Sequence, residues 1–277
     1  MTTTDFFIPR SIDEAVGLLR QHGTDLVVMG GGTSVMGMIN DGLLFPSKAM
    51  SLARAGIDGV HDADGVIVIG AATTIARLAQ LDRLPLLAQA AGMFGAPAVR
   101  NMATVGGNLF AAPPAGDIAV PLLALDAQVE LAGPHGRRTL PLDQFFTGLG
   151  QTARAADELV VALHVPHTSG QTAYLRYGRR QANTPAVVAV AVRVVSAANG
   201  TVSDARIALG AAGPHPLRAR QAETVLIGQM LDTSSIATAA AAAQAECDPP
   251  TDALASSWYR RRMVGVYVRR ALEQIRG

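Results

Sequence analysis

The chain has almost no cysteine. Cys247 is the single cysteine among 277 residues. One thiol excludes a disulfide within the chain, a cysteine-ligated iron–sulfur cluster and a cysteine-rich zinc site. Any redox chemistry in this chain therefore requires an organic cofactor.

Lysine is equally scarce, because Lys48 is the only one. Arginine and lysine differ in how they bind phosphate but not in charge, and we interpret the bias as genome composition. Lys+Arg number 23 against 22 Asp+Glu, a formal net charge of +1. This balance supplies no general attraction to nucleic acid, and we expect no nucleic-acid partner.

Long hydrophobic runs are also missing. No stretch approaches the roughly 20 apolar residues of a membrane-spanning helix. The first residues, MTTTDFFIPR, lack the basic and apolar segments of a signal peptide. We expect no membrane span and a cytoplasmic location. With 28.7 kDa and 49% hydrophobic residues, the chain is long enough for two domains.

Metal-binding and nucleophilic motifs are absent as well. No pair of histidines has the H-x-x-x-H or H-x-H spacing of metal ligands, and no Ser-His-Asp or Cys-His arrangement is evident. We predict neither a metal site nor a catalytic residue. Arg260 to Arg262 and Arg269-Arg270, near the C-terminus, are interpreted as a solvated or subunit-contacting helix face.

The chain does contain two glycine stretches. Residues 104–117 read TVGGNLFAAPPAGD, and Gly30-Gly31-Gly32 follows the apolar residues 26–29. Glycine lets backbone N–H groups approach an anion without interference from a Cβ atom. Hydroxyl and amide side chains flank both stretches and can donate to phosphate oxygens; they are Thr33, Ser34, Thr104 and Asn108. Together the stretches predict a clamp for a pyrophosphate.

The spacing of the glycines excludes two common nucleotide motifs. A G-x-G-x-x-G fingerprint starting at Gly30 would need a glycine at Val35, and no G-K-[ST] sequence occurs. A dinucleotide held by two separated loops favours FAD over NAD on a Rossmann fold. Asp117 is placed to accept a hydrogen bond from a ribose hydroxyl, although Asp is also a common helix N-cap.

The hydrophobic pattern predicts two domains. Residues 1–168 form the first, with subdomains of about 1–55 and 56–168, and 169–277 form the second. In the second, strands are predicted at 174–180, 187–195 and 202–209, with Asn199-Gly200 as a hairpin turn. Helices are predicted at 217–227, 236–246 and 256–275. A three-stranded antiparallel sheet covered on one face by these helices is expected.

Four segments carry a family resemblance. VVMGGGTSV, PAVRNMATVGGNLFAAPPAGDIAVPLLALDAQVEL, ELVVALHVP and YLRYGRR resemble the FAD-binding medium subunit of the molybdenum hydroxylases, including carbon monoxide dehydrogenase and bacterial xanthine, nicotine and aldehyde-type dehydrogenases. The long second segment is the most specific. The resemblance implies an α+β fold, with a two-part PCMH-type FAD-binding domain followed by a CO-dehydrogenase-flavoprotein-like domain.

The resemblance also implies which residues contact FAD. They form two loops and a few separate positions: Val28, Met29, Gly30, Gly31, Gly32, Thr33, Ser34 and Val35; Thr104, Val105, Gly106, Gly107 and Asn108; and Phe94, Asp117, Val160 and Arg176. Core packing is an alternative explanation for Phe94 and Val160. Asn183 lies where relatives often have an acidic residue near the isoalloxazine ring. An amide there removes a negative charge that would disfavour the anionic reduced flavin.

The implied function is that of an electron-transfer subunit. Substrate would be oxidised at a molybdenum–pterin site on a large subunit, and electrons would pass through two [2Fe–2S] clusters of a small subunit to FAD here. Quinone, NAD or oxygen would be the external acceptor, in a dimer of heterotrimers. The alternatives are a stand-alone flavin oxidoreductase of the fold type that includes the enolpyruvyl reductase of cell-wall synthesis, and a flavin-free scaffold subunit.

Overall fold

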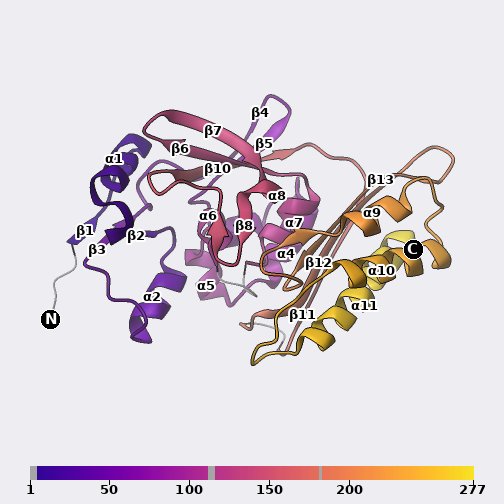
Figure 1. Cartoon of the computed structure of the whole chain (residues 1–277). Coiled ribbons are helices and arrows are strands. Elements are labelled where there is room, and N and C mark those ends of the chain that lie inside the picture. Colours follow the sequence, from indigo (N-terminus) through magenta and orange to yellow (C-terminus); the bar gives the residue numbers. More distant parts are fainter. Residues whose placement is uncertain (1–4, 112–115, 181–182) are drawn as a thin grey trace.

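The fold consists of two regions that lie side by side (Figure 1). The computed structural model describes residues 5–111, 116–180 and 183–277. Residues 112–115, within the second glycine stretch, lie outside the described residues. The N-terminal region comprises the residues before 167, and the C-terminal region comprises those after 170.

The chain begins with a small parallel sheet. Its strand order is β1 (Asp5–Phe7), β3 (Lys48–Ser51) and β2 (Leu26–Met29). Helix α1 (Ile12–His22) packs beside it, and the Ser11 side chain accepts the Glu14 N–H as the predicted N-cap. Gly23 ends this helix with φ 54°, a conformation that glycine adopts readily.

A five-stranded antiparallel sheet forms the rest of the N-terminal region. Its order is β4 (Val60–Ala63), β5 (Val66–Gly70), β10 (Leu159–Pro166), β6 (Gln128–Gly133) and β7 (Gly136–Pro141). Helix α6 contacts β10 of this sheet, and helix α8 contacts β6 and β7. The helices of this part of the chain are α3 (Ile75–Leu78), α4 (Pro85–Met93), α5 (Pro97–Met102), α6 (Val105–Leu109), α7 (Ala119–Ala124) and α8 (Leu142–Phe145). A two-stranded sheet of β8 (Phe146–Gly148) and β9 (Gln151–Thr152) follows α8.

The C-terminal region has a four-stranded antiparallel sheet in place of the expected three strands. Its strands are β11 (Gln171–Gly178), β12 (Ala186–Ser196), β13 (Val202–Gly210) and β14 (Leu217–Arg218). The predicted Asn199-Gly200 turn joins β12 to β13, with Gly200 at φ 82°. β14 replaces the start of the helix predicted at 217–227, because Leu217 and Arg218 pair with β13.

Helices cover both faces of this sheet, whereas one covered face was expected. The helices α9 (Arg220–Leu226), α10 (Thr233–Glu246) and α11 (Ser257–Arg276) pack on its outer face (Figure 1). Alternate residues of β12 serve the two faces: Val188 and Val190 belong to the core under the helices, and Ala189 and Ala191 belong to the core of the N-terminal region. Small alanine side chains on that second face leave room for α7.

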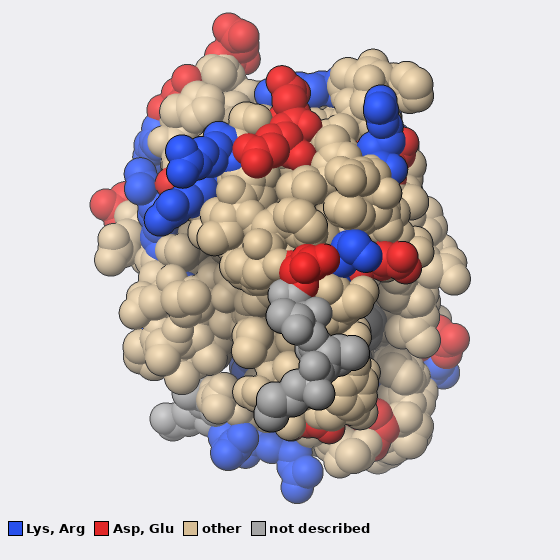
Figure 2. Space-filling view, turned by 90° about the vertical axis from the view of Figure 1, so that its left-hand side faces the viewer, with Lys and Arg blue, Asp and Glu red and all other residues tan. Residues whose placement is uncertain are grey.

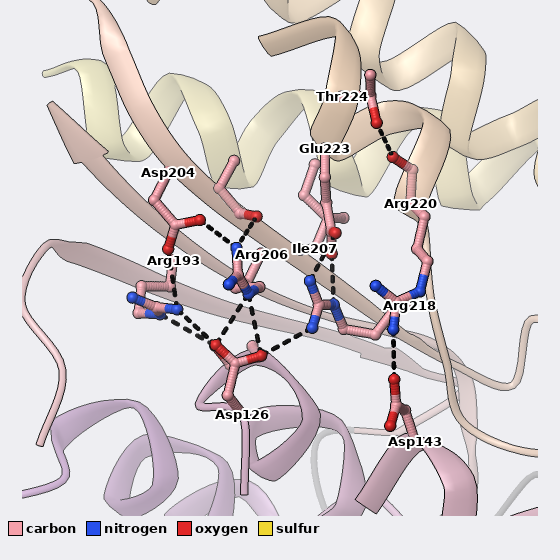
Figure 3. A network of polar contacts seen from close by, with 12 residues as sticks. Asp126, Asp143, Arg193, Asp204, Arg206, Ile207, Arg218, Arg220, Glu223 and Thr224 are labelled. Carbon is pink, nitrogen blue, oxygen red and sulfur yellow. Dashed lines mark hydrogen bonds and ion pairs between the residues drawn. The ribbon is translucent and has the colours of Figure 1, made fainter. Parts of the chain in front are cut away.

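An ionic cluster joins α7 to the sheet (Figure 3). Asp126, after α7, receives Arg193 of β12 at 2.9 Å, Arg206 of β13 at 2.9 Å and Arg218 of β14 at 2.8 Å. Glu223 of α9 binds Arg218 in turn, at 2.6 Å. Because these partners come from both regions, the cluster holds the N-terminal region against the C-terminal sheet.

The C-terminal arginines do not form one solvated face. Arg260 is fully buried, where its Nη2 binds Asp252 at 2.8 Å and its Nη1 donates to the Val187 carbonyl at 2.9 Å. Arg261 and Arg269 are exposed, as predicted. The burial of Arg260 depends on strand β12 lying beneath α11, which helical periodicity alone does not reveal.

Across the described part of the chain, none of the helices is both long enough and apolar enough to cross a membrane.

Candidate functional site

A pocket of about 620 Å³ lies where the two glycine stretches meet. All of the predicted site residues line it except Val105, Asp117 and Arg176. Further lining residues include Phe110, Arg154, Glu158 and Asn183. The volume falls within the range of small-molecule and cofactor sites, roughly 300–1,000 Å³.

The first loop presents unused backbone donors. It connects β2 to α2 (Thr33–Asn40), and Gly32 at φ 73° is the N-cap of that helix without a capping side chain. Within the described residues, the N–H groups of Gly30 and Gly31 have no hydrogen-bond partner. The first N–H groups of α2 also lack partners within the helix, and they carry the positive end of its dipole. This loop can therefore bind an anion through its backbone.

The second loop uses its backbone donors differently. The Val105 N–H donates to the Thr73 carbonyl at 2.9 Å and the Gly106 N–H to the Ala71 carbonyl at 2.9 Å. The Gly107 N–H donates to Oγ1 of Thr104, the N-cap of α6, at 3.2 Å. These three donors hold the loop in the fold, so they are not available to a ligand in this conformation. The expectation that both loops offer backbone donors to an anion stays a prediction.

The side chains of the second loop provide candidate groups for ligand binding. Asn108 Oδ1 accepts the Ile118 N–H at 3.1 Å, which leaves the amide NH₂ as the donor available to a ligand. Thr104 Oγ1 accepts from Gly107, and its hydroxyl hydrogen remains free to donate. Both residues line the pocket.

Glycine is required where the two loops touch. A Cβ atom on Gly31 would lie 1.5 Å from the Met102 carbonyl oxygen, and one on Gly30 would lie 2.4 Å from Thr104 Oγ1. A Cβ on Gly106 would lie 2.8 Å from the Ala71 Cβ. The glycines thus allow close chain crossings as well as ligand approach, and α2 and α6 converge on one pocket because of them.

Asp117 and Arg176 bind each other away from the pocket lining. Arg176 Nε lies 2.7 Å from Asp117 Oδ2, and both side chains are buried. Burial raises the pKa of Asp117, and the adjacent Arg176 opposes that rise. The carboxylate does not cap α7, whose N-cap is Ile118. The ion pair joins the N-terminal region to β11, and contacts of these two residues with FAD stay predictions.

Sequence reasoning missed Arg154 and Glu158. Arg154 Nη1 donates to the Glu158 carbonyl at 2.7 Å, and its guanidinium carbon lies 5.7 Å from the centre of the Phe110 ring. Arg138 binds both Glu158 carboxylate oxygens, at 2.6 and 2.7 Å, and lowers the pKa of Glu158. Arg154 matches no binding motif. Glu158 begins the ELVVALHVP segment but was not among the residues predicted to contact FAD.

The residues present fit FAD. The first loop offers backbone N–H groups for a pyrophosphate, while Thr33, Ser34 and Asn108 add side-chain donors. Apolar residues line the remainder and can cover the rings and exclude water; among them are Val28, Phe94, Leu159 and Val160.

Two family models match the chain in succession. Residues 2–168 match the FAD binding domain in molybdopterin dehydrogenase, and residues 173–275 match the CO dehydrogenase flavoprotein C-terminal domain. The carbon monoxide dehydrogenase medium chain of Hydrogenophaga pseudoflava is 33% identical over 273 residues, which cover 97% of this chain and 95% of that relative. The 6-hydroxypseudooxynicotine dehydrogenase complex subunit alpha of Paenarthrobacter nicotinovorans is 32% identical, over 97% and 93% of the two chains.

Solved structures agree with these matches. A chain of the Cu,Mo-CO dehydrogenase in its cyanide-inactivated form superposes with a TM-score of 0.94 at 31% identity, covering 98% of this chain and 97% of that one. A chain of quinoline 2-oxidoreductase from Pseudomonas putida 86 gives a TM-score of 0.91 at 25% identity, over 99% and 96% of the two chains. The chain therefore belongs to the family of FAD-binding medium subunits of the molybdenum hydroxylases, a family of oxidoreductase components.

Proposed function

We propose that this chain holds FAD in the pocket between the two glycine loops and relays electrons within a molybdenum hydroxylase complex. Electrons would arrive from the [2Fe–2S] clusters of a small subunit, after substrate oxidation at a molybdenum–pterin site on a large subunit. They would leave to an external acceptor, a quinone, NAD or oxygen. The observation that carries the proposal is the convergence of both predicted loops on one pocket.

The pyrophosphate of FAD is assigned to the first loop. The free N–H groups of Gly30 and Gly31 and the N-terminus of α2 provide the positive potential there. Asn108 and Thr104 add donors from the second loop. Bound FAD supplies the redox chemistry, and the chain's own residues bind it, orient it and keep water from it.

An exposed apolar surface supports the role of a subunit. Helix α2 has no buried residue, and Met36, Met38, Leu43 and Phe45 in and after it are exposed. The face that carries this part of the molecule shows uncharged areas between groups of charged side chains (Figure 2). Apolar patches of this kind mark protein interfaces. The relatives are named as a medium chain and a complex subunit, and we extend that to a dimer of heterotrimers in the cytoplasm.

A stand-alone flavin enzyme is less well supported by the pocket. Such an enzyme needs its own proton donor or acceptor beside the substrate. Arg154 and Glu158 are the charged residues among those that line the pocket in the described part of the chain. Arg138 holds Glu158 in its ionised form, so Glu158 is not available as an acid near neutral pH.

Purification with an absorption spectrum tests FAD binding. We expect a yellow protein that releases FAD, not FMN, in a one-to-one ratio. A colourless protein that FAD does not reconstitute would contradict the proposal and favour the flavin-free scaffold.

Co-purification tests the subunit role. A tagged form of the chain, expressed with the genes adjacent to its own, is expected to recover a molybdenum-containing and an iron–sulfur-containing chain. Substrate oxidation by the purified single chain would support the stand-alone enzyme instead.

A further inference from the structure

We propose that Arg154 places a positive charge beside the isoalloxazine end of bound FAD and thereby stabilises the reduced, anionic flavin over the oxidised flavin. The inference rests on the proposed binding of FAD in this pocket. According to this inference, Arg154 raises the midpoint potential of the bound flavin.

Arg154 is the one cation among the described residues that line the pocket. Its Nη1 donates to the carbonyls of Ala155 and Glu158, at 2.9 and 2.7 Å, and the guanidinium packs against Phe110. Its Nε and Nη2 donate to no described residue. The side chain is therefore held at one edge while its other donors remain free for a ligand.

Arg154 lies near two carboxylates, those of Asp157 and Glu158, whose charges partly offset its own. Both Glu158 oxygens bind Arg138 and not Arg154. In the described part of the chain, no carboxylate forms a salt bridge with Arg154. The guanidinium is partly buried, where burial lowers the pKa of Arg154 yet leaves it protonated at neutral pH. A partly desolvated charge acts on its surroundings more strongly than an exposed one.

The position of Arg154 separates it from the proposed pyrophosphate site. Thr104, the N-cap of α6, lies against Gly30. Phe110, directly after the C-terminal end of the same helix, packs against the Arg154 guanidinium. Five helical residues span about 7.5 Å. The anion at the first loop is already matched by free N–H groups. Arg154 therefore faces another part of FAD.

Of the parts of FAD beyond the pyrophosphate, the adenosine included, the isoalloxazine ring is the one whose charge changes on reduction, and we therefore place Arg154 beside it. On reduction it takes up two electrons and one proton, which binds N5, and N1 stays unprotonated with negative charge shared with the C2 carbonyl. No bond to the protein forms or breaks. A guanidinium beside this edge favours the reduced form, since charge near N1 tunes the flavin.

The test compares three full-length FAD-loaded proteins: wild type, Arg154→Met and Arg154→Lys. Midpoint potentials are measured by titration with dithionite, and the Kd of oxidised FAD by fluorescence. We expect Arg154→Met to weaken binding of reduced relative to oxidised FAD by about tenfold, a fall of about 30 mV for a two-electron couple. The Kd of oxidised FAD should change less than about twofold. The midpoint potential of Arg154→Lys should stay close to that of the wild type.

The outcomes distinguish this inference from the proposed function. An unchanged potential in Arg154→Met, or an equal loss of affinity for both redox forms, overturns the role of Arg154 while FAD binding stands. Failure of the wild type to bind FAD overturns both. If Arg154→Met does not fold, Arg154→Gln takes its place, with the same two measurements and the same outcomes for and against the inference.

Discussion

The first glycine loop, residues 30–35, and the second, residues 104–108, line the same pocket but contribute to it differently. In the first, the N–H groups of Gly30 and Gly31 are free. In the second, those of Val105, Gly106 and Gly107 are satisfied by the fold. A glycine pair next to a hydroxyl residue can thus mark an anion site or a tight packing contact, and hydrogen-bond partners distinguish the two.

The largest effect is expected where the first loop contacts Met102, two residues before the second loop. Gly31→Ala places a Cβ 1.5 Å from the Met102 carbonyl oxygen, so one of the two backbones must move. We expect FAD binding to be lost and the free energy of unfolding to fall by more than about 5 kcal/mol. Denaturant unfolding and FAD content measure both.

Gly37→Ala is the matched control, because it lies in α2 and an added Cβ there meets nothing within 4 Å. It should leave stability unchanged or raise it by up to about 1 kcal/mol. Equal behaviour of the two variants would show that Gly31 is not in close contact with Met102.

The second-largest effect is expected at the buried ion pair between Asp117 and Arg176. Asp117→Ala leaves the Arg176 guanidinium buried without its carboxylate. We expect a loss of about 3–5 kcal/mol in the free energy of unfolding. The double variant Asp117→Leu/Arg176→Met removes both charges and should recover most of this loss. If the double variant is as unstable as the single one, the buried charge is not the cause.

Variants of Gly106 and Gly107 should distinguish effects on packing from effects on FAD binding within the second loop. Gly106→Ala crowds Ala71 and should cost about 1–3 kcal/mol, whereas Gly107→Ala meets only Thr104 Oγ1, at 3.0 Å, and should cost less than about 1 kcal/mol. Gly107→Leu should still weaken FAD binding at least tenfold, because Gly107 lines the pocket. Stoichiometric, tightly bound FAD in Gly107→Leu would argue against this placement of the cofactor.

The smallest effect is expected for the ion pair between Arg138 and Glu158, in the part of the pocket wall that contains Arg154 and lies outside both loops. Arg138 lowers the pKa of Glu158 in the folded protein, so the pair stabilises the fold above the unfolded value of about 4.3. This stabilisation disappears as the pH falls through the lowered folded value. Glu158→Gln should cost at most about 1 kcal/mol at pH 7, because Arg138 is largely exposed.

Unfolding measurements of wild type and Glu158→Gln at pH 7 and pH 3 check this dependence. The difference between the two proteins should be smaller at the lower pH and should shrink in 1 M salt. A difference that is as large at pH 3 as at pH 7 would point to packing and not to charge.

Local sequence signals predicted much of the fold. The Ser11 cap, the Asn199-Gly200 hairpin and three long strands of the C-terminal sheet are present as predicted. The prediction failed at Leu217 and Arg218, which form β14, because their pairing partner β13 determines their conformation. It also failed at Arg260, which is buried because β12 lies beneath its helix.

The candidate site divides in the same way. Glycine runs and flanking hydroxyl residues are contiguous in the sequence, so the pattern predicted both loops. Arg154 belongs to no motif, and Glu158 is only the first residue of the ELVVALHVP segment. Their place in the pocket depends on contacts with Phe110 and Arg138. Asp117 and Arg176 were predicted as separate FAD contacts, yet the fold brings them together as an ion pair.

The sequence alone determined that no cysteine-ligated cluster lies in this chain and that two glycine loops are present, because both conclusions depend only on residue type and spacing. The sequence motifs also identified the family. Only the tertiary structure decided which N–H groups stay free, which arginines are buried and which charges pair. Those properties arise from contacts between distant segments: Ala71 accepts from Gly106, Asp126 gathers three arginines, and Arg138 binds Glu158. Hydrogen bonding and burial therefore determine the chemistry of a site whose position the sequence predicts.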